Sequence, residues 1–236
     1  MLLGILILSL ISLWPPVLIY QAVASHNNHK DNSDENFEED FEDEDSIQLC
    51  CTWGMELDDG VLTYNIDDDS SSEEQDAVRS AIEEWDSKID TLEFETVSSI
   101  KNSNIKIEFQ DKSDKVIEGE EIAGQTITTF DQDGLLENAE ITISRSVQAY
   151  GFDPSTIEQI AKHEIGHALG LGHANFDGNL MAEQVDDGTD NISDCEIKAV
   201  IESNYWKLGN YLNVDSDTSP SFSIKDSTTC DGEDES

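Results

Sequence analysis

The chain has 236 residues, of which 12 are basic and 53 are acidic, and a net charge of −41. This length fits one domain with appendages, since typical domains span about 100–200 residues. So acidic a surface repels polyanions, which argues against nucleic acid and anionic membranes as partners, although it can recruit divalent cations.

The N-terminal segment is an apolar run that ends in small residues. Positions 22–24 fit an A-x-A cleavage signal, and a proline pair at 15–16 interrupts the run, so we expect a signal peptide over 1–24. No basic residue precedes the run, and residues 2–20 are nearly long enough to span a bilayer, so an uncleaved N-terminal anchor is the alternative. Either reading places the rest outside the cytoplasm, secreted or anchored to the outer face of the membrane.

Two segments lack the apolar residues that a core requires. Residues 25–48 are dense in acidic side chains and cannot recover the entropy of ordering, which predicts a disordered spacer. Residues 213–236 are predicted to be a loose acidic C-terminal tail fastened by Cys230. The globular domain is therefore expected over 49–212.

Cysteine usage agrees with export. The chain has four cysteines and no C-x-x-C pair, which favours disulfides in an oxidising compartment over a structural zinc site. A bond within the adjacent pair would be strained, so each of the two is expected to join one distal cysteine, in an order that stays open. The four are Cys50, Cys51, Cys195 and Cys230.

The globular pattern begins near Thr52. Residues 61–66 alternate apolar and polar, as a strand does. Ser71 and Glu74 then fit a capping box, and apolar residues at helical spacing predict a helix over 70–89. Because a helix links the first two strands, a sheet with parallel character is implied. Further strands are predicted at 92–97, 104–110, 123–130 and 139–145.

Two more helices are expected in the C-terminal half. The first has Asp153 as its N-cap, Pro154 at its first helical position and Gly170 at its end. The second opens with a capping box from Ser193 to Glu196 and stops at Gly209.

The first of these helices carries a histidine pair. His163 and His167 are four residues apart, about one helical turn, so they stand on one face and can share a metal ion. Glu164 is rotated off the pair, where a carboxylate can reach a metal-bound water without being a ligand.

A third histidine follows the end of that helix. Gly170 ends the helix without steric resistance and Gly172 adds freedom, so that His173 can turn back towards the pair. Three neutral imidazoles and one water make the open tetrahedral site typical of catalytic zinc. A single histidine here would be read as a core residue, but packing needs rarely produce this whole set.

The extended pattern H-E-x-x-H-x-x-G-x-x-H, followed by a Met in "GNLM", resembles the metzincin zinc endopeptidases. The order of elements and the stretches "LTYNI", "AIEEWDSKIDTLEF" and "NLM" are most similar to the matrixin branch, over roughly residues 52 to 206. The resemblance implies an α+β metzincin catalytic domain: a twisted, mostly parallel sheet with two long helices, an active-site helix, a Met-turn and a C-terminal helix.

The resemblance also implies roles for individual residues. His163, His167 and His173 would bind one catalytic zinc ion. Glu164 would be the general base that takes a proton from the zinc-bound water and later passes it to the leaving amine. Met181 would be the methionine of the turn beneath the zinc.

The resemblance further implies that a substrate chain lies antiparallel to an edge strand above the zinc, for which residues 123–128 are the candidate. The sequence departs from the matrixin pattern in three places. The Pro-Arg-Cys-Gly latency segment is missing, residues 52–162 contain no histidine for a second, structural zinc, and Ala174 stands where matrixins usually carry Ser.

Calcium is the other cofactor to consider. The stretch "FDQDGLLENAE" places Asp131, Asp133, Glu137 and Glu140 around a turn, and oxygen-rich loops of this kind bind calcium. The stretch does not fit the EF-hand loop, and a plain hairpin turn is the favoured alternative in so acidic a chain.

The predicted function is a secreted, monomeric, zinc-dependent endopeptidase that acts on protein or peptide substrates. Neither nucleic acid nor a membrane is expected as a partner, unless the N-terminal segment stays uncleaved. The alternative is a catalytically inactive surface protein of the same fold that binds cations or a partner through its acidic shell. Retention of Glu164 favours the enzyme.

Overall fold

The computed structural model describes residues 44–111, 116–117, 120–121, 123–145, 154–183, 191–209 and 225–230. The expected signal peptide or anchor over 1–24 lies outside the described residues, as do the expected spacer up to residue 43 and Asp153. No helix in the described ranges combines the length and the apolar character needed to cross a membrane.

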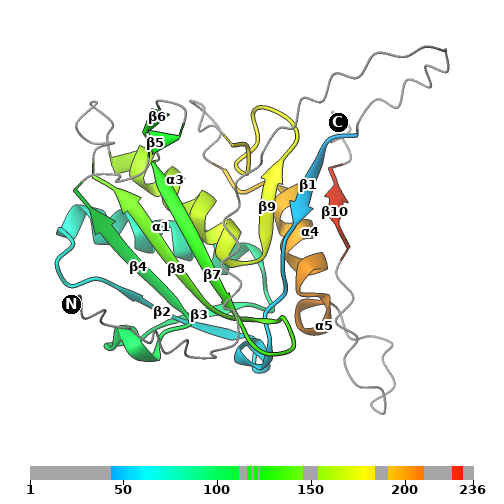
Figure 1. The fold of residues 1–236 in the computed structure, drawn as a ribbon, viewed down its shortest axis with the longest axis horizontal. Coiled ribbons are helices and arrows are strands. Elements are labelled where there is room, and N and C mark those ends of the chain that lie inside the picture. The colour runs from blue at the N-terminus through cyan, green and yellow to red at the C-terminus, as the bar shows by residue number, and fades with distance from the viewer. Residues whose placement is uncertain are drawn as a thin grey trace, which may run out of the picture.

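A five-stranded sheet forms the centre of the fold (Figure 1). Four neighbouring strands are parallel, and the fifth, at one edge, runs antiparallel. The mixed fold with a mostly parallel sheet is thereby confirmed. In spatial order the strands are β3 (Glu93–Thr96), β2 (Val61–Ile66), β4 (Ile105–Gln110), β8 (Leu136–Ser144) and β7 (Gly124–Phe130).

Two long helices, α1 (Ser72–Lys88) and α3 (Pro154–Ala168), lie side by side against one face of this sheet (Figure 1). α1 connects the parallel neighbours β2 and β3 and begins at the predicted capping box of Ser71 and Glu74. The indole of Trp85 on α1 is fully buried and donates a hydrogen bond of 3.1 Å to the carbonyl oxygen of Lys162 on α3. Packing between the helices therefore fixes α3 relative to the sheet.

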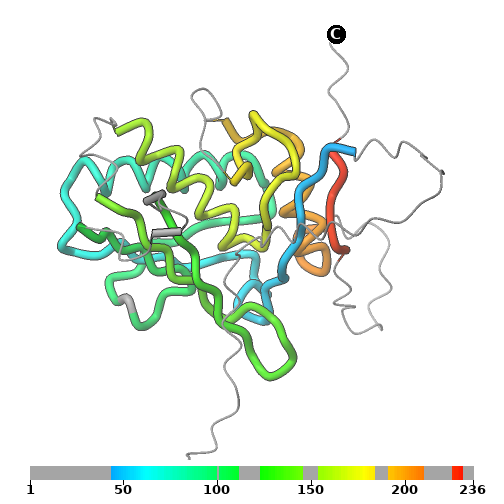
Figure 2. Tube along the Cα trace, turned by 45° about the horizontal axis from the view of Figure 1, so that its top comes forward, coloured from blue at the N-terminus to red at the C-terminus, as the bar shows by residue number. Residues whose placement is uncertain are grey.

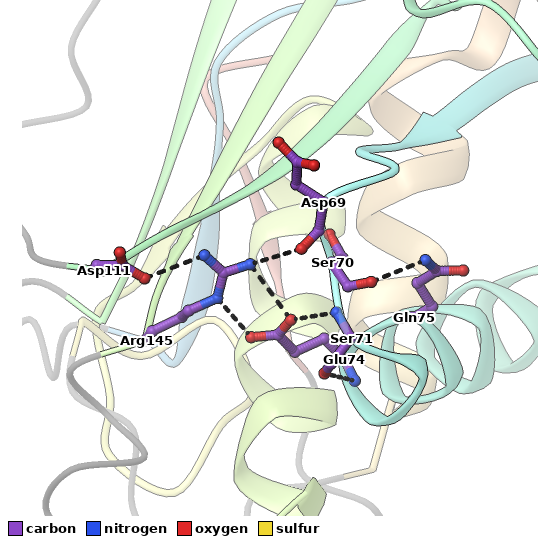
Figure 3. A network of polar contacts seen from close by, with 7 residues as sticks. All are labelled: Asp69, Ser70, Ser71, Glu74, Gln75, Asp111 and Arg145. Carbon is purple, nitrogen blue, oxygen red and sulfur yellow. Dashed lines mark hydrogen bonds and ion pairs between the residues drawn. The ribbon is translucent and has the colours of Figure 1, made fainter.

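A polar network ties the start of α1 to the ends of two central strands (Figure 3). Arg145, which follows β8, places its Nε 2.8 Å from the buried Glu74 carboxylate and an Nη 3.1 Å from that of Asp111. Although burial alone would raise it, the pKa of Glu74 is held below its usual value by hydrogen bonds from Arg145 and Ser71. Glu74 of the predicted capping box thus also forms an ion pair with Arg145.

A second sheet of three short antiparallel strands lies beside the first: β1 (Ser46–Leu49) is central, flanked by β9 (Leu171–Ala174) and β10 (Ser227–Thr229). Figure 2 shows β1 in blue running beside β10 in red, although the two are far apart in sequence. The sequence did not predict this sheet. β1 begins inside the expected spacer, and β10 lies inside the expected loose tail. Neither was predicted, because strands of three or four residues are too short to show a period of two.

The predicted C-terminal helix is divided into α4 (Asp194–Ser203) and α5 (Tyr205–Leu208). Its capping box of Ser193 and Glu196 is present as expected. At the division, the fully buried Asn204 donates to the carbonyl oxygen of Leu169 at 2.8 Å and accepts from the backbone N–H of Trp53 at 3.0 Å. Short elements complete the described residues: the 3-10 helices η1 (Met55–Leu57) and η2 (Ile100–Asn102) and the strands β5 (Val116–Ile117) and β6 (Glu120–Glu121).

The disulfide prediction is wrong: the bonds are Cys50–Cys51 and Cys195–Cys230. Cys51 lies beside Ser203, whose hydroxyl donates to its carbonyl oxygen, and Ser203 is about two helical turns from Cys195 on α4. Pairing of β1 with β10 instead brings Cys230 to α4, so Cys230 does fasten the C-terminal segment.

Candidate active site

Helix α3 carries three of the predicted site residues, His163, Glu164 and His167, and buries all of them. The spacing of four places the two imidazole rings on one face, with centroids 4.6 Å apart. The structure therefore confirms that the two histidines share one face of a helix.

The chain leaves α3 through Gly170, whose φ of +101° is a conformation that residues with a Cβ rarely adopt. A Cβ there would also meet the carbonyl oxygen of Cys51 and the hydroxyl of Ser203. Gly172 has a different role from the expected one: its φ is not positive, and the missing side chain makes room for Gln48 of β1, whose Cβ would be 2.8 Å from a Cβ at this position. Both glycines thus let β9 pack closely on β1.

His173 lies on β9, in the second sheet, and its ring centroid is 5.5 Å from that of His163 and 4.9 Å from that of His167. One ring nitrogen from each histidine lies within 4.8 Å of the others. Among the described residues, these three histidines are the one group of at least three ligand-type side chains close enough to share a metal ion. Two elements, a helix and a strand, therefore bring the three imidazoles together.

Backbone carbonyls fix the tautomers of the two helical histidines. Nδ1 of His163 lies 2.7 Å from the carbonyl oxygen of Leu180, and Nδ1 of His167 lies 2.9 Å from that of Leu171. A carbonyl oxygen can only accept, so each Nδ1 carries the hydrogen and donates it. Each Nε2 is left with its lone pair, the state required of a metal ligand whose other nitrogen is held by an outer partner.

The histidines are also held in the neutral form. Burial, opposed by the Leu180 hydrogen bond and aided by His173, lowers the pKa of His163 to about 4. Burial likewise lowers the pKa of His167 well below its ordinary value, and that of His173 falls for the same reason, although the Glu183 carboxylate acts in the opposite direction. Three neutral nitrogen donors converging from two elements fit a zinc site.

The carboxyl group of Glu164 contacts β7. Thr126 of β7 places its hydroxyl oxygen 2.6 Å from a carboxylate oxygen of Glu164. Burial raises the pKa of Glu164 to about 7, although the Thr126 hydrogen bond acts to lower it. A divalent cation beside it would favour the ionised form again. A carboxyl group poised near neutrality can both take up and release a proton.

Met181 is fully buried. It packs against α3 at Gly166, where a Cβ would lie 2.5 Å from the methionine sulfur. Its carbonyl oxygen accepts a hydrogen bond of 2.8 Å from the N–H of Ala174, the residue after His173. The residue predicted to lie beneath a metal therefore contacts both elements that carry histidines.

The candidate calcium residues do not form such a cluster among the described residues. The Asp131 carboxylate accepts hydrogen bonds from the N–H groups of Asp133, at 2.8 Å, and Leu135, at 2.9 Å, which closes the turn between β7 and β8. Glu140 lies 2.7 Å from the Lys106 ammonium, and Glu137 is exposed on β8. A hairpin turn, the favoured alternative, describes the segment.

Sequence reasoning missed three contacts of the site: the Thr126 hydroxyl and the carbonyls of Leu171 and Leu180. Thr126 lies in a stretch correctly predicted as a strand, but 38 positions separate it from Glu164, and no local pattern indicates that they touch. A carbonyl oxygen has no sequence signature at all, because every residue carries one.

Comparison with known proteins gives a family. The sequence model of the matrixins, a peptidase family, matches residues 53–204, more than half of the chain. A search of curated proteins finds no match. A solved structure described as "GM1 bound form of the ECX AB5 holotoxin" is 18% identical, with 71% of this chain and 79% of that chain covered. Its TM-score of 0.39 is too low to support a conclusion about this chain. On the family match and the histidine site together, the chain belongs to the matrixin family of metalloproteases.

Proposed function

We propose that this protein is a zinc-dependent endopeptidase that hydrolyses peptide bonds in protein substrates. One observation carries the proposal: three neutral imidazoles converge to within 4.8 Å beside a buried carboxyl group. Membership of the matrixin family supports the same chemistry. An inactive protein of this fold would have no need of a base at Glu164.

His163, His167 and His173 are the residues that would hold the ion. Bound zinc supplies Lewis acidity, which makes water a better nucleophile and polarises a carbonyl oxygen. Glu164 accepts a proton from the attacking water as its oxygen bonds to the carbonyl carbon. It then delivers that proton to the amine nitrogen as the C–N bond breaks, so the carboxylate is regenerated.

Residues 123–128, which include the first part of the edge strand β7, are the proposed place for the substrate backbone. This stretch pairs with β8 on one side and lies against Glu164, so an extended peptide could add along its other side by main-chain hydrogen bonds. Met181 is proposed as the methionine of the turn beneath the zinc, with a packing role. The two disulfides favour an exported protein, since such bonds persist in oxidising compartments.

The proposal is tested by the hydrolysis of casein by purified protein, with and without a zinc chelator. We expect cleavage that stops on chelation and returns when zinc is added back. Glu164→Gln should lower the rate by at least about 100-fold, because a positioned general base contributes about that much or more. Zinc content should be unchanged in this variant, since Glu164 is not a ligand.

Glu183→Gln is the matched control, because this exposed carboxylate also acts on His173 yet has no contact with Glu164 in the described structure. Its activity should stay within a few-fold of the parent. Activity that survives Glu164→Gln but is lost in Glu183→Gln would show that Glu164 is not the general base. Cleavage that persists without metal would refute the proposed function.

A further inference from the structure

Strand β7 presents two successive inward-facing positions to the Glu164 carboxyl group. Gly124 and Thr126 are two residues apart, so they lie on the same face of the strand. A Cβ at Gly124 would be 2.8 Å from Cγ and 2.9 Å from Cδ of Glu164 and would collide with Oε1. The glycine therefore gives the carboxyl group its space, while Thr126 supplies a hydrogen-bonding partner.

The Thr126 hydroxyl has two acceptors and one proton. Its oxygen is 2.6 Å from Oε2 of Glu164 and 3.0 Å from the main-chain carbonyl oxygen of the same residue. The shorter distance is typical of a hydroxyl that donates to an ionised carboxylate, the stronger of the two interactions. With Oε2 held in this way, Oε1 is the oxygen left to meet a water molecule.

We propose that Thr126 is a positioning residue for the general base. Its hydroxyl anchors Oε2 so that the other carboxylate oxygen stays directed towards the attacking water. This inference rests on the proposed function and adds to it a residue that positions the general base. No other element supplies Glu164 with a side-chain hydrogen bond in the described structure.

The second acceptor explains how the anchor survives proton transfer. When Glu164 has taken a proton from water on Oε1, Oε2 is no longer charged and is a weaker acceptor, and the Thr126 proton can turn to the main-chain carbonyl at 3.0 Å. When the proton passes from Oε1 to the leaving amine nitrogen, the hydroxyl turns back to the carboxylate. A hydroxyl is suited to both states because its proton can rotate between two acceptors.

Thr126→Val tests the proposal, because valine keeps the shape of the side chain and removes the hydroxyl. We expect kcat on a peptide substrate to fall by about 10–100-fold, the usual effect of losing an outer partner, with KM and zinc content unchanged. Thr126→Ser, which restores a hydroxyl, should recover kcat to within about threefold. A Thr126→Val enzyme with a kcat within twofold of the parent would overturn the proposal, as would a Thr126→Ser enzyme no better than Thr126→Val.

Thr129→Val is the matched control. Thr129 lies on the same strand, also bonds a main-chain carbonyl, that of Asn138 at 3.4 Å, and is an odd number of residues away, on the opposite face. Its kcat should stay within about twofold of the parent. An equal loss in Thr129→Val would show that any hydroxyl removed from β7 acts through the stability of the strand, and would also overturn the proposal.

A crystal structure of each zinc-loaded variant separates this inference from the proposed function. In Thr126→Val the Glu164 carboxylate should leave its position or occupy several, and in Thr126→Ser it should return. A carboxylate that stays in place in Thr126→Val overturns the positioning role, whatever the activity. If the parent cleaves no peptide, the proposed function fails, and the carboxylate positions still decide whether Thr126 holds this side chain.

Discussion

The helix and the strand that carry the three histidines differ in how they are held. Helix α3 brings His163 and His167 together by local geometry and packs on α1 and the central sheet. Strand β9, which carries His173, belongs to a sheet whose other strands lie at 46–49 and 227–229, far away in sequence. The pair on the helix is thus specified within one turn, whereas the third ligand depends on contacts between distant parts of the chain.

This difference indicates where the site is vulnerable. Helix α3 contributes to a large core of buried residues. The second sheet has short strands, and it is joined to the rest of the fold by the buried Ile47, Leu49 and Leu171, by a disulfide and by the turn at Gly170. Changes in the second sheet should therefore lower both stability and zinc affinity, while changes in the Glu74–Arg145 network should lower stability alone.

The largest expected effect comes from His173→Ala. We expect zinc affinity to fall by more than the roughly 10–100-fold typical of losing an outer partner, because a direct ligand is removed. Equilibrium dialysis against zinc, followed by metal analysis, measures this, with His167→Ala as the comparison on the helix. Full zinc retention in His173→Ala would mean that the second sheet takes no part in the metal site.

Removal of the Cys195–Cys230 disulfide is expected to lower the free energy of unfolding by about 2–4 kcal/mol, since the bond closes a loop over a sequence separation of 35. Zinc affinity should fall as well, because β10 supports β1 and β1 positions β9. Urea unfolding of the Cys195→Ser, Cys230→Ser double variant measures the loss. The Cys50→Ser, Cys51→Ser double variant is the control, because a separation of 1 closes almost no loop. An equal loss of unfolding free energy in both double variants would show that closure of the loop is not the cause.

Gly170→Ala is expected to destabilise the protein by about 2–3 kcal/mol, since it combines a positive φ with a collision against Cys51 and Ser203. Gly178→Ala separates the two causes: its φ of +77° is also positive, but nothing lies within 4 Å of a Cβ there. This control should cost only about 1 kcal/mol. Thermal unfolding of both variants makes the comparison, and equal shifts would show that close packing at the turn is unimportant.

Arg145→Met should have the smallest effect, about 1–2 kcal/mol at neutral pH, from loss of the hydrogen bonds to the buried Glu74. The pKa of Glu74 is lowered on folding, so its contribution is present above the unfolded value near 4.5 and is lost as the pH falls through the folded value. The difference between parent and variant should therefore shrink below about pH 4. Urea unfolding at several pH values tests this, and a difference that grows with acidity would reverse the sign of the argument. Zinc affinity should be unchanged.

Local patterns predicted much of the central sheet and both long helices. The capping boxes at Ser71 and Ser193 were placed correctly because a cap is an interaction over three residues. The division of the last helix at Asn204 was not predicted, since its cause is a bond to the backbone of Trp53, more than 150 positions away. The disulfides were mispredicted because a bond between the adjacent Cys50 and Cys51 was excluded, whereas Cys230 reaches Cys195 through the pairing of β1 with β10, which no local pattern shows.

The sequence by itself determined the donor set: two imidazoles one helical turn apart, a carboxyl group beside them and a glycine to end the helix. Those follow from the 3.6-residue period and from the steric freedom of glycine, which are properties of neighbouring residues. Only the tertiary structure decided how His173 reaches the pair, which carbonyls hold the histidine tautomers and that Thr126 meets Glu164. These contacts join segments separated by tens of residues, and such closeness is set by the packing of the whole core and leaves no periodic trace in the chain.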